Sequence, residues 1–229
     1  MAPARREGEM IERNQPTCFP SYLAVAVSSR EDGTMLDRTL ADRHDESVVA
    51  RRRKFTKAVG IDYDSCVYQL ISYGQAETYD LICEVSEPNT VGVHADALYT
   101  ETPGVGLFLP VADCVATVVY DPIRRTVTSA HLGRHASVAK LMRKLVSFMA
   151  TKGSQPSDLI IWMAPSVTQS DYRMEYFDDA GDADWIPYIE RMDDGFYLDL
   201  AGFNTNLAVV SGVKADNIHI SQANTASDS

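Results

Sequence analysis

The sequence predicts an α/β (α+β) fold in which helices are layered against a mixed β-sheet. Strand-like runs are numerous and closely spaced, which does not fit a strict alternation of one strand with one helix. A few longer segments carry apolar residues at the spacing of a helix face. The 229 residues, of which 45% are hydrophobic, suffice for one large core. We therefore expect a flexible tail at residues 1–21 and a single domain at 22–229.

The first half of the chain contains one predicted helix and several predicted strands. The helix is expected over 45–59, because Asp45 is a good N-cap, apolar residues recur after it, and Gly60 follows as a stop. Its charged cluster at 51–54 is typical of a solvated helix face, with binding of a substrate anion as the alternative. Short apolar runs predict strands at 22–28, 66–72, 79–85, 95–100 and 106–111.

The stretch 111–135, VADCVATVVYDPIRRTVTSAHLGRH, is the one around which the rest is organised. Its runs 115–120 and 126–130 are joined by a turn containing Pro122, which predicts a β-hairpin. The outer ends of a hairpin lie side by side, so we expect Cys114 and His131 to be neighbours. A helix predicted over 137–148 would point its N-terminus at this pair. That terminus would favour an anion such as phosphate.

The remaining segments alternate between strand-like and helical patterns. A buried strand is predicted at 159–164, and the pattern at 170–177 is ambiguous. A short helix interrupted at Pro187 is expected over 183–192, followed by a short segment at 197–200. A helix at 202–210, ending at Gly212, and a last strand at 217–221 complete the chain.

Composition excludes several classes of partner. The net charge of −11 and the pI of about 4.8 argue against nucleic acid, because a phosphate backbone requires a basic face. No apolar run approaches the roughly 18 residues of a membrane span, and no signal-type core follows the charged start. We therefore expect a soluble, cytoplasmic protein without a membrane partner. The four cysteines lack paired or CxxC spacing, which indicates reduced thiols.

The order of motifs resembles the YfiH-like laccase-domain family. In that family A-D-A-L, a P-G turn, A-D-C, a D-P turn and A-H-x-G-W-R-G follow one another, as they largely do within 95–138 here. Ser29 with Arg30, Asp45 with Arg52, and the run DLAGFNTNLAVVSGV also match family positions. The resemblance implies an α-β-β-α sandwich. It further implies a zinc-dependent purine nucleoside phosphorylase with adenosine deaminase activity, whose partners are a nucleoside and phosphate.

The resemblance also implies a metal site, and here the sequence departs from the family. The family ligands are a histidine of Q-V-H-G, the cysteine of A-D-C and the histidine of A-H-x-G. Cys114 and His131 match the last two, but QLISYGQ places Tyr73 at the first. A phenol is a poor substitute for imidazole, and a catalytic zinc ion commonly takes three protein ligands. His94 or His135 could substitute; otherwise they are a loop histidine and a surface residue at a helix start.

The site residues follow from these matches. The resemblance implies catalytic roles for Cys114 and His131 and phosphate binding near Arg134, with Arg30 and Arg52 as further contributors. Two later family patterns are altered: G-W-R-G reads GRHA here, and G-P-x-I-G-x-C-x-Y reads APSVTQSDY, ending on Tyr172.

Three other interpretations remain open. Without a metal, Cys114 beside His131 has the arrangement of a cysteine nucleophile, which would make the protein a hydrolase. A member without catalysis would bind a ligand or partner only, and a lone cysteine is most often a small buried hydrophobe. Copper is not expected, because five scattered histidines cannot build the clusters of a multicopper phenol oxidase.

Overall fold

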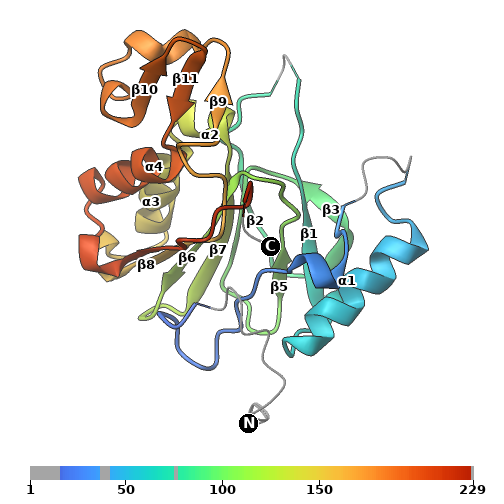
Figure 1. The fold of residues 1–229 in the computed structure, drawn as a ribbon. Coiled ribbons are helices and arrows are strands. Elements are labelled where there is room, and N and C mark those ends of the chain that lie inside the picture. The colour runs from blue at the N-terminus through green and yellow to red at the C-terminus, as the bar shows by residue number, and fades with distance from the viewer. Residues whose placement is uncertain (1–15, 37–41, 75–76, 228–229) are drawn as a thin grey trace.

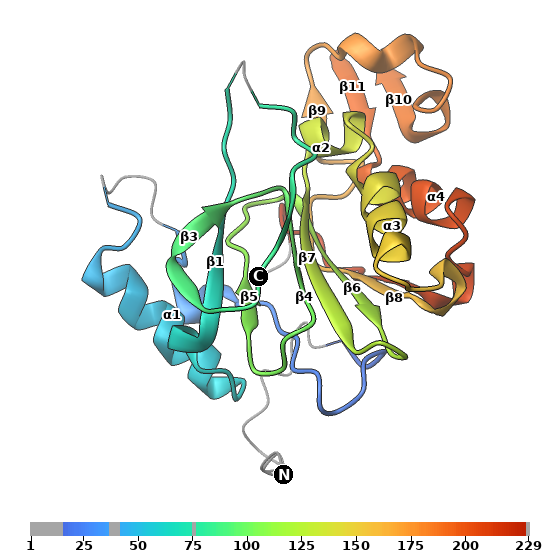
Figure 2. The same cartoon turned by 180° about the vertical axis from the view of Figure 1, so that it is seen from behind.

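The computed structural model describes residues 16–36, 42–74 and 77–227, so most of the predicted tail at 1–21 lies outside the described residues. Figures 1 and 2 show four layers in the order helices, sheet, sheet, helix. Helices α3 (Leu141–Thr151) and α4 (Leu200–Val210) form one outer layer, and α1 (Glu46–Ala58) forms the other. The expected α-β-β-α sandwich is therefore confirmed.

The larger sheet is mixed and has six strands. Their order is β12 (Ile218–Ile220), β8 (Ile160–Met163), β6 (Val115–Asp121), β7 (Thr126–Leu132), β4 (Ala97–Thr100) and β2 (Ile82–Glu84). Strands β6 and β7 form the predicted antiparallel hairpin. Val115, Val119 and Leu132 project from one face of this hairpin into the core shared with α3 and α4.

The smaller sheet is parallel and consists of β3 (Asn89–His94), β1 (Cys66–Leu70) and β5 (Gly106–Phe108). Strand β3 was not predicted, because half of its residues are exposed and it has no continuous apolar run. Val67 of β1 and Leu98 of β4 belong to one small buried cluster. This cluster holds the two sheets together.

The helix predicted over 137–148 is wrong in its extent. It divides into α2 (Arg134–Val138) and α3 at Lys140, whose φ of +58° is left-handed. Ser137 is fully buried, and its hydroxyl accepts a hydrogen bond of 2.7 Å from Asn204 of α4. This bond holds α2 against α4 at the break. Since α2 is little more than one turn long, it cannot provide the helix dipole expected beside the hairpin.

Two other predictions fail. Residues 189–192 are strand β10 (Ile189–Met192) rather than helix, paired with β11 (Gly195–Leu198), which also pairs with β9 (Arg173–Met174). Only a 3₁₀ turn, Ile186–Tyr188, surrounds Pro187. Residues 22–28 are not a strand either; the segment lines a cavity instead of extending a sheet. An apolar run alone does not distinguish a strand of a sheet from an irregular segment that lines a cavity.

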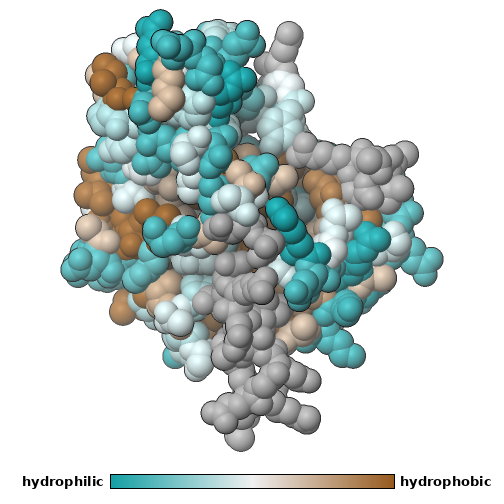
Figure 3. All heavy atoms as spheres, in the orientation of Figure 1, coloured by the Kyte–Doolittle hydropathy of each residue, from teal (hydrophilic) through white to brown (hydrophobic). Residues whose placement is uncertain are grey.

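Figure 3 shows one face of the molecule. This face is mainly hydrophilic, and its hydrophobic residues lie in smaller groups between polar ones. None of the helices within the described ranges has the length and apolar character needed to cross a membrane.

Arg52 occupies the core between α1 and the smaller sheet. Its side chain is fully buried, and its guanidinium lies 4.4 Å from the ring centre of Tyr68. It donates hydrogen bonds to the carbonyl oxygens of Met35 (2.9 Å) and Arg43 (2.8 Å) and to the hydroxyl of Tyr63 (3.2 Å). Because these donors are directed at neutral acceptors inside the protein, the arrangement favours a structural role over the expected phosphate contact.

We predict that Arg52→Ala lowers the free energy of unfolding by about 2–4 kcal/mol, since it leaves buried acceptors without a donor and creates a cavity. Urea denaturation measures the change. The exposed neighbour Arg53, which forms an exposed ion pair with Asp64, is the control: Arg53→Ala should change stability little. An unchanged denaturation midpoint in Arg52→Ala, together with weaker phosphate binding, would contradict the structural role and support the anion contact.

Candidate functional site

The hairpin brings Cys114 and His131 together, as the sequence predicts. Cys114 directly precedes β6, and His131 in β7 pairs with Ala116. A β-carbon added to Gly133 would lie 3.1 Å from the sulfur of Cys114 and 3.3 Å from Nε2 of His131. The thiol and the imidazole therefore converge on the same small space beside Gly133, and a side chain at this position would crowd both.

A sharp turn presents Cys114 to this space. The backbone N–H of Cys114 donates to the carbonyl oxygen of Ala112 at 2.8 Å, which closes a three-residue turn centred on Asp113. Asp113 has a φ of +67°, a region that residues other than glycine seldom occupy. Strained backbone of this kind often occurs where a functional side chain must be held in one direction.

A buried polar link brings the end of β1 to the same place. The hydroxyl of Ser129 in β7 donates to Oε1 of Gln69 in β1 at 3.0 Å, and Nε2 of Gln69 donates to the carbonyl of Ala95 at 3.1 Å. Ser129 is two residues before His131, and Gln69 is four residues before Tyr73. The link holds the end of β1 near β7, and Tyr73, three residues after β1, lies beside His131.

Aromatic rings surround the imidazole groups. The ring of Tyr73, 57% exposed, is centred 6.3 Å from the ring of His131 and 6.3 Å from that of His135. Tyr79 stacks on His135 at 4.4 Å with an interplanar angle of 17°. The hydroxyl of Tyr79 also bonds to the backbone N–H and carbonyl of Gly74, the residue that follows Tyr73. The sequence did not indicate Tyr79.

Arg134 and His135 form a pair at the start of α2. Nη2 of Arg134 lies 2.8 Å from Nε2 of His135. Because a guanidinium only donates, this contact assigns the acceptor role to Nε2 and the proton to Nδ1 of a neutral imidazole. Burial and the adjacent charge of Arg134 both lower the pKa of His135, consistent with this neutral form.

Tyr172 is a further residue that interacts electrostatically with Cys114. Burial raises the pKa of its phenol, a thiolate at Cys114 would raise it further, and the charge of Arg134 lowers it. Tyr172 therefore interacts electrostatically with both residues. Its sequence signal was the final tyrosine of the altered family pattern at 164–172.

The donor set does not fit a three-ligand zinc site. Within 16–36, 42–74 and 77–227, no three His, Cys, Asp or Glu residues are grouped so as to hold a metal ion. Cys114 and His131 provide two donors, and Tyr73 is the nearby group in place of the first family histidine. Nε2 of His135 already accepts from Arg134. A catalytic zinc ion commonly needs one ligand more than Cys114 and His131 supply.

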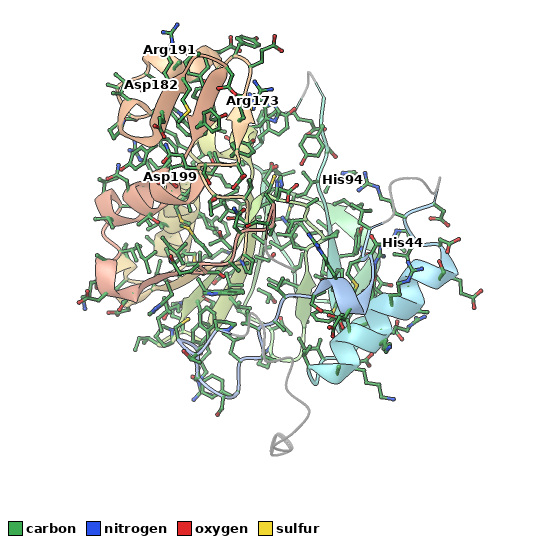
Figure 4. All side chains as sticks on the ribbon, viewed as in Figure 1. His44, His94, Arg173, Asp182, Arg191 and Asp199 are labelled. Atoms are coloured by element: carbon green, nitrogen blue, oxygen red, sulfur yellow. The ribbon has the colours of Figure 1, made fainter. Side chains whose placement is uncertain are left out.

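His94, the other substitute, has a different partner. Its Nδ1 lies 2.6 Å from the hydroxyl of Ser72. Figure 4 shows His94 on the side of β1 and β3, and His44 beside α1.

A cavity of about 790 Å³ adjoins the site. Its walls include segment 23–30, with Arg30 at its end, and Ala116 and Ser129 of the hairpin. Ala116 pairs directly with His131, and Ser129 lies two residues before His131 on the same strand. Because side chains alternate between the two faces, all three belong to the same face of the sheet. His131 therefore continues the row of side chains that lines the cavity.

Comparison with known proteins gives the chain relatives of one kind. A purine nucleoside phosphorylase of Deinococcus radiodurans is 32% identical over 123 residues, which cover 52% of this chain and 47% of that protein. Purine nucleoside phosphorylase YlmD of Bacillus subtilis is 36% identical over 81 residues, or 35% of this chain and 29% of that protein. The matched region thus spans about half or less of these relatives.

Solved structures share the fold. A YfiH protein of Bacillus licheniformis superposes with a TM-score of 0.71 and 22% identity, covering 83% of this chain and 76% of that one. YlmD of Geobacillus stearothermophilus gives a TM-score of 0.71 and 23% identity, covering 84% and 74%. The family model described as "Multi-copper polyphenol oxidoreductase laccase" matches residues 28–229. The chain therefore belongs to this YfiH-like laccase-domain family.

Proposed function

We propose that the chain is a purine nucleoside phosphorylase, which uses inorganic phosphate to split a purine nucleoside into free base and ribose 1-phosphate. The observation that carries the proposal is the convergence of Cys114 and His131 beside Gly133, with Arg134 next to them and tyrosine rings around them. The names of the relatives support the same substrate class.

Arg134 is the proposed phosphate-binding residue. A guanidinium has five N–H donors, so the bond from Nη2 to His135 leaves others for phosphate oxygens. The contact to His135 also limits the orientation of the guanidinium. A phosphate oxygen held there would attack C1′ of the ribose and form the new C–O bond while the bond from C1′ to the base nitrogen breaks.

His131 and the aromatic rings are proposed to act on the base. A purine is planar, and the exposed ring of Tyr73 is a suitable stacking surface next to His131. The electron pair of the breaking bond moves into the purine, whose developing negative charge requires a hydrogen bond or a proton. His131, which is 5% exposed on a paired strand, is the proposed donor.

We predict that inosine yields hypoxanthine only when phosphate is present, and that His131→Ala or Cys114→Ala lowers kcat/KM by roughly 100-fold or more. Chromatography of the free base and of ribose 1-phosphate measures the reaction.

Arg134→Gln should raise KM for phosphate by about tenfold, with a smaller effect on KM for the nucleoside. Arg191→Gln, which removes an exposed arginine on β10, is its matched control.

The same incubations distinguish the alternatives. Free base formed without phosphate would identify a hydrolase and overturn the phosphorylase proposal. Inosine formed from adenosine would add deaminase activity. No product from inosine, adenosine or guanosine, with protein supplied with zinc, would contradict an enzyme and favour a member that binds its ligand without turnover.

Zinc binding remains a prediction of the family resemblance, and Tyr73 provides its test. We expect Tyr73→His to bind zinc at least about tenfold more tightly than the unmodified chain, because imidazole is a better ligand than a phenol that must first lose its proton. Competition with a chelating dye measures affinity, and elemental analysis measures zinc per chain.

Tyr22→His is the matched control, since Tyr22 is 59% exposed and its hydroxyl contacts Tyr120, at the other end of β6 from Cys114. It should not change zinc affinity. The contrary result is that the unmodified chain already holds one zinc ion as tightly as Tyr73→His, and that His131→Ala loses it. A third ligand would then be present, and the inference that Cys114 and His131 lack one would be wrong.

A further inference from the structure

The C-terminal segment 223–227 packs against the turn that presents Cys114. Asn224 forms an isolated parallel bridge with Ser166, and the backbone N–H of Thr225 donates to the carbonyl of Ser166 at 3.1 Å. The hydroxyl of Thr225 donates to Oδ1 of Asp113 at 2.8 Å. A segment distant in sequence thus bonds directly to the residue before Cys114.

Asn224 fixes the segment from the other side. Its Oδ1 accepts from the backbone N–H of Thr168 at 3.3 Å, and its Nδ2 donates to Oδ2 of Asp171 at 2.7 Å. The hydrogen bond from Asn224, together with those from the hydroxyls of Ser170 and Thr168, holds the pKa of the Asp171 carboxyl below its usual range, so the carboxylate remains an acceptor. The C-terminal segment and the loop after β8 therefore form one hydrogen-bonded unit.

Asp113 is bonded to both parts of this unit. Its carboxylate accepts from Thr225, and its carbonyl oxygen accepts from the backbone N–H of Val167 at 3.0 Å. A left-handed φ outside glycine is unfavourable and persists only when surrounding contacts impose it. The contacts to Thr225 and Val167 are of this kind. If they were lost, Asp113 could relax and the following residue, Cys114, would change direction.

We propose that Thr225 is a positioning residue for Cys114: the C-terminal segment holds the turn at Asp113, and this turn holds the thiol beside His131. The importance of the position rests on the proposed function, but the contacts and the test do not require turnover. Thr225 bonds to Asp113, the residue before Cys114, so its effect on the thiol passes through the turn at Asp113.

The test measures alkylation of each cysteine by iodoacetamide at one fixed pH, with mass spectrometry to assign the sites. In Thr225→Val, loss of one hydrogen bond should release the confined thiol and speed alkylation of Cys114 about fivefold. Thr225→Ser keeps the hydroxyl and should restore the original rate. Cys18, Cys66 and Cys83 serve as internal references, because Thr225 forms none of its described bonds near them.

Thr151→Val is the matched control. It removes a threonine hydroxyl that bonds within its own helix, to the carbonyl of Phe148, and should leave every rate unchanged. An unchanged Cys114 rate in Thr225→Val, or an equal rise at all four cysteines, would overturn the inference. If Thr225→Val also lowers kcat while KM is unchanged, the positioning extends to catalysis. A chain without phosphorylase activity but with the selective rise would support the inference while refuting the proposed reaction.

Discussion

The hydrogen-bonded ladder between β6 and β7 is the constraint on which the site depends. Its seven residue pairs set His131 opposite Ala116, and β4 extends the ladder on the other side, where the backbone N–H of His131 donates to the carbonyl of Asp96. Side chains alternate between the two faces of a strand. A slip of one residue would therefore turn His131 into the core against α3 and bring Leu132 to the cavity face. The core that selects the register also selects which imidazole meets Cys114.

Local sequence patterns were sufficient to predict a helix or strand wherever its burial agrees with the spacing of its apolar residues. The hairpin, β1, β8, α1 and α4 are continuous apolar or helically spaced segments, and each was predicted near its observed position. Where burial is partial, the sequence signal was too weak. Strand β3 alternates with exposed residues, β10 was read as helix, and the break at Lys140 arises from contacts between α2 and α4.

The candidate site divides in the same way. The proximity of Cys114 and His131 follows from hairpin geometry, so the sequence alone predicts it. Tyr79, which precedes β2, stacks on His135, and Tyr172 interacts electrostatically with Cys114 from a third segment of the chain. Arg52 and Arg134 were both expected to contribute to phosphate binding, yet one is fully buried and the other lies beside the site. Burial of a single arginine is decided by tertiary packing, which no motif encodes.

The edge strands of the larger sheet affect how readily copies of the chain associate. Its outermost strands, β12 and β2, are each three residues long, while the central hairpin strands have seven. An exposed strand edge is a template on which another chain can add a strand, and a short edge offers few free backbone groups for this. Glu84 at the end of β2 is moreover paired with Lys152, which places charge at that edge. Growth of the sheet from molecule to molecule, the first step of β-aggregation, is thus disfavoured at both ends.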